Sequence, residues 1–317
     1  MSQSPYEGTF RDRIAANKRN SLFLIAIFLA FVAVFGYVIG YAWIGDPVRA
    51  LFGLVLAFVV GTISGFVSYY AGGRIVLAAS RAQEVTHDEA PQLFNVVEEM
   101  AIAGGLPMPK VYIIKDSAPN AFATGRDPEH ASVAVTSGLL EKLNRDELQG
   151  VIAHEMSHVG NFDIRYAMLV GILVGTTVLI SDFFLRSLWF GGGRRREGGG
   201  QAQIIMIIVA VVLAILAPIF ARLLQLSISR QREYLADATA VKFTRNPKGL
   251  ADALQKISGD REVLEAANRA TAHLYIVNPI KRFEKRATGL FSTHPPIEER
   301  IQILRSMETG GIPQTTG

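Results

Sequence analysis

The chain of 317 residues is 50% hydrophobic and only 19% charged, and its mean hydropathy is +0.26. An ordinary soluble protein has about a quarter charged residues, so this composition excludes that class. It also excludes a disordered chain, which would be poor in hydrophobic residues. Cysteine is absent, which excludes disulfides, thiolate metal ligands and cysteine nucleophiles. The formal net charge is only +4 and the aromatic residues lie in the apolar runs, so we expect no nucleic-acid partner and favour a lipid bilayer.

Two uncharged apolar runs predict a pair of transmembrane helices. Residues 21–44 and 50–73 contain no charged side chain, and each run is long enough to cross a hydrocarbon core of about 30 Å. The turn Gly45-Asp46-Pro47 between them suits a helical hairpin. A cleaved signal peptide is the alternative for the first run, which is too long for one. Basic residues precede the first run and follow the second, so we expect both flanks to face the cytoplasm.

Two weaker apolar runs, 166–181 and 204–221, flank a Gly- and Arg-rich loop at 191–200. If both runs span the bilayer, the arginines of the loop lie outside, against the positive-inside tendency. If neither run crosses, the loop stays in the cytoplasm, and the sequence leaves both alternatives open. In either case the number of crossings between residues 165 and 222 is even, so the polar segments on the two sides share one compartment.

The remaining chain is predicted to form a water-facing domain in two pieces, 74–165 and 222–317. Apolar residues at helical spacing predict a helix that ends at Gly104-Gly105, and β-branched runs at 111–114 and 132–136 predict strands. Asn144 and Glu147 predict a capping box that opens a helix to about Val159. Beyond residue 222 we expect helices with breaks near 246–247, 278–279 and 294–296. The other segments are the N-terminal stretch 1–20, the hairpin 21–73, and 166–221 with its loop.

The pentapeptide His154-Glu155-Met156-Ser157-His158 lies on the helix predicted after Asn144. Residues four apart share one helix face and are separated by about 6 Å of rise, so two imidazole nitrogens can bind one metal ion. The alternative is a salt-bridged helix face with two solvated histidines, but the neighbouring residues 151–153 are apolar. The motif therefore favours a zinc site, with Glu155 near its open side.

A catalytic zinc requires a third protein ligand and leaves its fourth position to water. Because the chain has no cysteine, this ligand must be a histidine or a carboxylate. Glu233 directly follows the last apolar run, and Asp237 comes four residues later, so one carboxylate could bind the metal while the other accepts a hydrogen bond from a ligand imidazole. The alternative for this pair is a charged helix face paired with Arg230 and Arg232.

These residues support hydrolysis by an activated water. Zinc lowers the pKa of a bound water to about 7 and polarises a carbonyl as a Lewis acid. We expect Glu155 to accept the proton of the water and to pass it to the leaving amine. The resulting oxyanion needs a further donor, for which His294, before Pro295-Pro296, is the candidate. The alternative is that His294 only caps a helix that starts near Pro296.

With these motifs in place, the chain resembles the HtpX-type integral-membrane zinc endopeptidases, which are related to the membrane CAAX prenyl proteases. The resemblance covers about residues 20 to 305. It is carried by the twin spans, the stretch 120–125, the stretch 136–140 leading to Glu147-Leu148, the zinc helix followed by Asn161 and Asp163, the stretch 233–237, and His294-Pro295.

The resemblance implies a mainly α-helical integral-membrane protein with a small β-sheet, in which a zincin-like (gluzincin-type) metalloprotease domain is built on the membrane helices. It implies that His154, His158 and Glu233 bind one zinc ion per chain, that Glu155 is the general base, and that Asp237 orients a ligand. It also implies four hydrophobic segments and an active site on the cytoplasmic side of the bacterial inner membrane. The loop at 191–200 departs from the family's pattern, which leaves the path of the third and fourth segments open.

Asn120, Ala121, Phe122 and Ala123 resemble the edge strand with which zinc endopeptidases hold an extended substrate. The unpaired backbone groups of an edge strand can pair with a peptide, so such a strand tolerates many substrate sequences. The alternative is an ordinary turn entered from Pro119.

Two functional hypotheses from different classes follow. The first is a membrane-anchored zinc endopeptidase that cleaves membrane or misfolded polypeptides at the cytoplasmic face, with proteolytic quality control implied by the family. The second is a non-hydrolytic, zinc-stabilised membrane scaffold, and a CAAX-type prenyl-protein endopeptidase is a third, related possibility. Glu155 favours hydrolysis, because a structural zinc site has no use for a base and usually fills all four positions with protein ligands.

Overall fold

The computed structural model describes residues 10–170, 230–266, 271, 274–277 and 295–308, together with positions 173, 182, 186, 204, 208, 209, 211 and 212. The chain divides into two compact units. The hairpin unit comprises Arg19–Tyr70 and Leu169–Gln225, and the α/β unit comprises Met1–Lys18, Ala71–Met168 and Leu226–Gly317. The loop at 191–200, most of the two weaker apolar runs, the break predicted at 278–279 and His294 lie outside the described residues.

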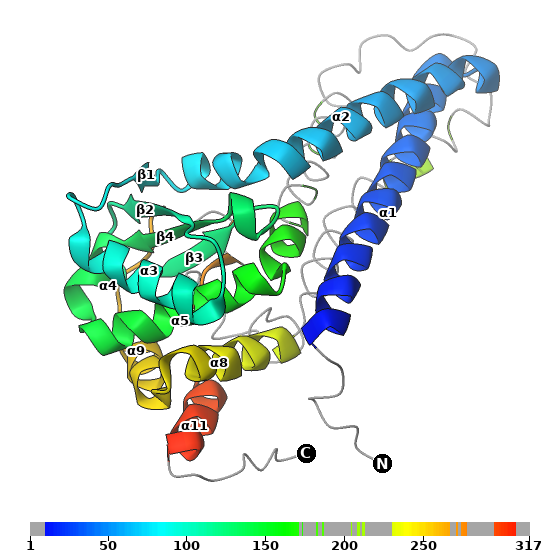
Figure 1. Cartoon of the computed structure of the whole chain (residues 1–317). Coiled ribbons are helices and arrows are strands. Elements are labelled where there is room, and N and C mark those ends of the chain that lie inside the picture. The colour runs from blue at the N-terminus through cyan, green and yellow to red at the C-terminus, as the bar shows by residue number, and fades with distance from the viewer. Residues whose placement is uncertain are drawn as a thin grey trace. The chain divides into compact units, whose positions relative to one another are not determined.

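Helices α1, Phe10–Ile44, and α2, Pro47–Ala79, are joined by a short turn, as predicted (Figure 1). Ala15–Tyr41 and Pro47–Ala79 are long and apolar enough to cross a membrane, which confirms the two predicted spans. Gly45 adopts a left-handed φ of 74°, and the Asp46 carboxylate accepts a 2.7 Å hydrogen bond from the N–H of Arg49, so the turn ends α1 and caps α2. Both helices extend beyond the apolar runs, because hydrophobicity marks only the length that lipid can surround.

Small residues allow α1 and α2 to approach closely within the hairpin unit. A Cβ atom placed on Gly36 would lie 2.2 Å from the Cβ atom of Ala57 and 2.6 Å from the carbonyl oxygen of Gly53. These distances are much shorter than a van der Waals contact, so a larger side chain at Gly36 would push the helices apart. Close packing of this kind is a main source of helix association in lipid, where apolar burial contributes little.

Among the described residues, the α/β unit contains a four-stranded sheet in the order β1-β2-β4-β3. The strands are β1, Gln83–Glu84; β2, Lys110–Ile114; β3, Ala121–Thr124; and β4, Ser132–Thr136. β2 runs parallel to β4, whereas β1 and β3 run antiparallel to their neighbours. The two strands predicted from β-branched runs are therefore confirmed as the central pair. The stretch 121–124 forms an edge strand, so the alternative of an ordinary turn was wrong.

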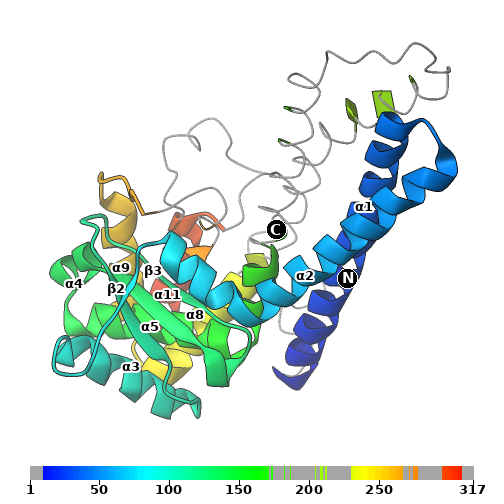
Figure 2. The ribbon, with the colours of Figure 1, turned by 90° about the horizontal axis from the view of Figure 1, so that it is seen from above.

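Helix α5, Arg145–Gly160, lies at the centre of the α/β unit. It packs against β3 and three helices, which are α3, Pro91–Gly104; α8, Arg230–Thr244; and α9, Pro247–Gly259. Figure 1 shows α5 beneath the sheet with α8 and α9 below it, and in Figure 2, seen from above, the strands overlie α5. Helix α11, Ile297–Glu308, packs on α8 and α9. The short helices η1, Pro128–His130, and α4, Ser137–Lys142, precede and follow β4.

Local sequence signals fix the ends of these helices. The side chain of Asn144 accepts a 2.9 Å hydrogen bond from the N–H of Glu147, and the Glu147 carboxylate accepts one of 2.8 Å from the N–H of Asn144. The predicted capping box therefore opens α5. Gly105 ends α3 in a left-handed conformation, and α9 begins at Pro247, both as predicted. Because most of α5 is buried, its histidines are held on a fixed support.

Candidate functional site

Helix α5 presents two histidines on one face. The Nε2 atoms of His154 and His158 lie only 3.2 Å apart, and the two rings meet edge to face at a centroid distance of 4.7 Å. Both side chains are largely removed from solvent, which contradicts the alternative of two solvated histidines. The helical spacing of four residues therefore converges two ring nitrogens on one point, as the sequence predicted.

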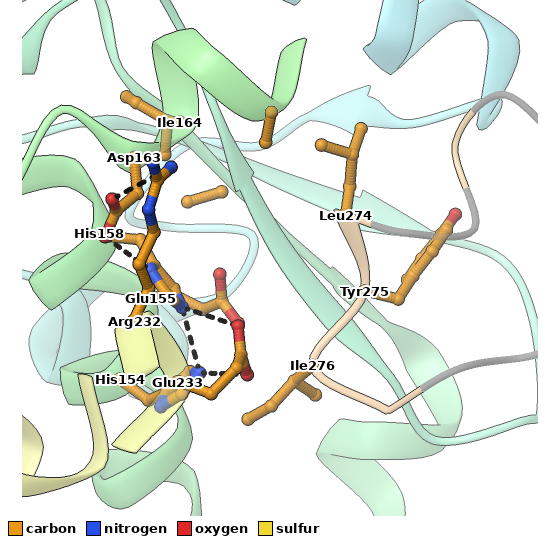
Figure 3. Close-up of a pocket in the computed structure, with 12 residues that line it drawn as sticks. His154, Glu155, His158, Asp163, Ile164, Arg232, Glu233, Leu274, Tyr275 and Ile276 are labelled. Atoms are coloured by element: carbon orange, nitrogen blue, oxygen red, sulfur yellow. Dashed lines mark hydrogen bonds and ion pairs between the residues drawn. The ribbon is translucent and has the colours of Figure 1, made fainter. Parts of the chain in front are cut away.

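Helix α8 brings Glu233 to the same point. Its two carboxylate oxygens lie 3.7 Å from Nε2 of His154 and 3.6 Å from Nε2 of His158, and the three ligand atoms lie within 4.8 Å of one another. Figure 3 shows the two imidazoles and this carboxylate pointing toward one another. Glu233 is only 4% exposed and its carboxylate faces the two imidazoles, which favours a ligand over the alternative of a charged helix face paired with Arg230 and Arg232. Arg232 instead lies over the ring of Tyr166 and 3.7 Å from Asp163.

The outer nitrogen of each imidazole contacts a carboxylate. Nδ1 of His154 lies 2.9 Å from Asp237, and Nδ1 of His158 lies 3.1 Å from Asp163. An ionised carboxylate only accepts hydrogen bonds, so each Nδ1 carries a proton, and a metal ion bound between the rings would take the lone pair of each Nε2. The two Nε2 atoms and the carboxylate of Glu233 thus face one point, where a single metal ion would contact all three.

The geometry of these donors fits zinc. Ligands about 2.0 to 2.1 Å from a tetrahedral zinc stand about 3.3 to 3.4 Å apart. The two Nε2 atoms are 3.2 Å apart, each lies 3.6 to 3.7 Å from a different oxygen of Glu233, and one ligand atom from each residue can be chosen so that all three lie within 4.8 Å of one another. Two imidazoles and one carboxylate are also a donor set that catalytic zinc accepts. These three residues form the zinc-binding group of the chain.

Arg300 of α11 is a component of the site that the sequence analysis missed. Its side chain is fully buried and donates hydrogen bonds of 2.8 and 2.7 Å to the two oxygens of Asp237. Its third nitrogen lies 3.3 Å from Glu233. The signal in the sequence is that Arg300 takes a core-facing position of α11, four residues before the buried Leu304, where an apolar residue is usual.

The charges around the site leave room for a divalent cation. Four buried carboxylates meet there, those of Glu155, Asp163, Glu233 and Asp237, whereas the guanidinium groups that contact them are those of Arg232 and Arg300. The raised pKa values of Glu155 and His158 reduce this excess of negative charge when no metal is bound. Buried carboxylates are costly without positive charge beside them, and a bound Zn²⁺ would supply such charge in place of a proton on His158.

The pKa values of the site reflect its burial and the charges of the neighbouring groups. Burial raises the pKa of Glu155 to about 7, and the charge of Glu233 acts in the same direction. Burial lowers the pKa of His158, but the hydrogen bond to Asp163 and the charge of Glu233 outweigh it and raise this pKa to about 9. Burial also acts to raise the pKa of Asp237, yet the guanidinium of Arg300 holds it below its usual range. Burial lowers the pKa of His154, so among the two histidines the carboxylates favour positive charge at His158.

The edge strand β3 passes beside this group. The backbone of Ala123 lies near enough to the carboxylate of Glu155 to act against the rise of its pKa. Farther along the strand, the N–H of Ile276 donates a 3.0 Å hydrogen bond to the carbonyl of Ala121, and the side-chain amide of Asn120 donates one of 2.8 Å to the carbonyl of Val277. The first part of the edge is therefore covered by the chain's own residues 274–277, whereas Ala123 faces the pocket.

One pocket contains the zinc-binding group and has two chemically different walls (Figure 3). Its polar wall consists of His154, Glu155, His158, Asp163, Arg232 and Glu233, and its mainly apolar wall consists of Ala123, Ile164, Ala167, Leu274, Tyr275 and Ile276. His294, the predicted oxyanion donor, lies outside the described residues. Helix α11 begins at Ile297, just after the break predicted at Pro295-Pro296.

Comparison with known proteins agrees with this site. The sequence profile of peptidase family M48 matches residues 87–308. A Protease HtpX homolog of Listeria monocytogenes serotype 4b (strain CLIP80459) is 47% identical over 305 residues, which cover 93% of this chain and 99% of the relative. Protease HtpX homologs of Dictyoglomus turgidum and Streptococcus gordonii are 44% and 43% identical, over 94% and 93% of this chain and 95% and 99% of their own lengths. The crystal structure of S. mikatae Ste24p aligns with a TM-score of 0.46 and 20% identity, over 92% of this chain and 66% of Ste24p.

Proposed function

Because the chain belongs to peptidase family M48, in which it is a zinc metalloprotease of the HtpX type, we propose that it hydrolyses peptide bonds of membrane or misfolded proteins at the cytoplasmic face of the bacterial membrane. The observation that carries this proposal is the single pocket in which the zinc-binding group, Glu155 and the edge strand meet. Quality control of membrane proteins is the role that we assign to this activity.

Glu155 is proposed as the general base. When zinc is bound by the three ligands, it supplies Lewis-acid polarisation and makes a water nucleophilic at neutral pH. Glu155 follows a zinc ligand directly in α5 and lines the same pocket, so its carboxylate is placed to take the proton of the attacking water and to deliver it to the nitrogen of the leaving amine. His294 is proposed to donate a hydrogen bond to the developing oxyanion.

Other residues position these groups. Asp237 is proposed to hold the ring of His154 through Nδ1, and Arg300 fixes Asp237 by bonds to both carboxylate oxygens. A two-point guanidinium bond sets the orientation of a carboxylate as well as its charge. The ring of His154 is therefore held by two buried side chains in series, Asp237 and Arg300.

Substrate is proposed to bind as an extended chain along the edge formed by Asn120, Ala121, Phe122 and Ala123. Residues 274–277 already use the backbone near Ala121, so we expect the substrate to approach Ala123 first, beside the polar wall. The apolar side chains that line the same pocket, such as Ile164 and Leu274, favour substrates with apolar residues near the scissile bond.

The decisive experiment compares Glu155→Gln with Glu141→Gln in detergent-purified protein. Glu141 is exposed on α4, so it controls for the loss of a carboxylate. We expect Glu155→Gln to retain one zinc per chain and to lose about a hundredfold or more of casein cleavage, while Glu141→Gln retains both properties. Undiminished cleavage by Glu155→Gln would exclude Glu155 as the base.

The proposed orientation and substrate class require their own measurements. A cysteine introduced at Glu141 should react with a membrane-impermeant maleimide only after the cells are opened, and labelling of intact cells would place the α/β unit outside. A farnesylated peptide supplied beside its unmodified form tests the prenyl-protein alternative. Equal cleavage of the two supports a general endopeptidase, whereas selective cleavage of the farnesylated form would overturn the proposed substrate class.

A further inference from the structure

The N-terminal part of α1 contacts the turn that follows the zinc-binding helix. Asn17 is only 6% exposed, and its side-chain amide donates hydrogen bonds of 2.8 Å to the carbonyl of Asn161 and 2.7 Å to Oδ1 of Asp163. Asn17 and this turn belong to the same compact unit. A buried amide that bonds two groups of one short turn fixes the position of that turn.

The turn has a backbone conformation that needs such support. Phe162, between the two residues that Asn17 contacts, has a φ of 61°, which places it in the left-handed region that L residues with large side chains rarely adopt. The ammonium group of Lys18 lies 4.4 Å from the centroid of the Phe162 ring, and the guanidinium of Arg165 lies 4.9 Å from it. Two adjacent residues of α1 therefore hold the backbone and the side chain of this turn.

Asp163 connects the turn to the metal site. Its Oδ1 atom accepts the hydrogen bond from Asn17, and its Oδ2 atom lies 3.1 Å from Nδ1 of His158. A carboxylate is planar, so fixing one oxygen also fixes the direction of the other. The bond from Asn17 thus orients the acceptor that sets the tautomer and the ring angle of His158.

We propose that Asn17 is a positioning residue for the zinc ligand His158 and acts through Asp163. The zinc affinity of the site then depends on residues of α1 that precede the first apolar run. This inference rests on the zinc-binding group alone and is independent of the substrate and of the role of Glu155. A residue that only packs α1 in place would stabilise the metal-free and the zinc-loaded protein equally.

The test measures zinc release and thermal unfolding in full-length, detergent-purified protein. Asn17→Ala is compared with Asn20→Ala, the same change three residues later on α1. Loss of a direct partner of a metal-binding histidine costs about 10- to 100-fold in metal affinity, and Asn17 acts one contact farther out. We therefore expect Asn17→Ala to release zinc to a colorimetric chelator about fivefold faster than wild type, and Asn20→Ala to match wild type.

Thermal unfolding separates positioning from packing. We expect Asn17→Ala to reduce the rise in unfolding temperature that zinc produces, with a smaller change in the metal-free protein. The Co²⁺-substituted form should show an altered visible spectrum in Asn17→Ala, because the angle of one imidazole changes. A double variant with Asp163→Ala should release zinc no faster than Asp163→Ala alone. Wild-type zinc release by Asn17→Ala, or equal losses of unfolding temperature with and without zinc, would overturn the proposal.

Discussion

Arg300 carries much of the charge balance at the zinc site. Its guanidinium bonds both oxygens of Asp237 and lies 3.3 Å from Glu233, and it is fully buried. Removing one partner of a buried ion pair leaves an uncompensated charge in a medium that solvates it poorly. The residue is therefore expected to matter for folding as well as for the orientation of the ligands.

Arg300→Met should lower the free energy of unfolding by about 3 to 5 kcal/mol, because two buried carboxylates lose their guanidinium. Arg300→Lys should recover only part of the loss, since an ammonium cannot form the two-point bond. Arg305→Met on the same helix is the control. Its ion pair with Asp252 is half-exposed, so its loss should cost less than about 1 kcal/mol. Denaturation in detergent followed by circular dichroism measures all three, and equal losses at both positions would refute the argument.

Sequence reasoning found the two histidine ligands because they are close together in the sequence. His154 and His158 are four apart on one helix, and Glu233 was identified by its position after an apolar run and by its companion Asp237. Arg300 and Asn17 were not found, because their partners are distant in the sequence. Arg300 is 63 residues from Asp237, and Asn17 is 146 residues from Asp163. Nothing in the neighbouring residues marks such a contact, apart from a polar side chain at a buried position of a helix.

At the scale of elements, the hairpin depends on the close contact between α1 and α2. Apolar runs predicted that two helices exist, but they did not predict which faces meet, because nearly every side chain in such a run is hydrophobic. The small residues decide this, since Gly36 packs directly on Gly53 and Ala57. The edge strand β3 was predicted only through a resemblance, because a strand of four residues, Ala121–Thr124, is too short for a periodic signal.

Gly36→Leu should therefore destabilise the hairpin, whereas Gly65→Leu should not. A Cβ atom on Gly36 meets Ala57 at 2.2 Å, but one on Gly65 meets none of the described residues within 4 Å. Both changes add the same side chain to an apolar helix, so they differ only in the space available. We expect a loss of about 1 to 3 kcal/mol for Gly36→Leu, as for an overpacked core. The measurement is the temperature at which each variant aggregates in detergent, followed by size-exclusion chromatography. Equal aggregation temperatures for the two variants would contradict this prediction.

On the scale of the whole molecule, the zinc-binding group links parts of the chain that are distant in sequence. His154 and His158 come from α5 and Glu233 from α8, with the two weaker apolar runs between them in the sequence. The four buried carboxylates around the group exceed the two guanidinium groups that contact them. A bound zinc ion would therefore both add positive charge among these carboxylates and join α5 to α8.

Removing zinc should accordingly destabilise the α/β unit as a whole. A ligand that binds only the folded state contributes about 2.7 kcal/mol at a concentration 100 times its Kd, so dialysis against EDTA should lower the unfolding temperature and added Zn²⁺ should restore it. Glu233→Ala is the matched variant, because it lacks one ligand and should show little response to either treatment. The hairpin unit provides an internal reference, since the residues of the zinc-binding group all belong to the α/β unit. Unchanged unfolding of wild type in EDTA, with zinc shown to be absent, would mean that the metal serves chemistry alone and that packing of α5 on α8 suffices to hold the site together.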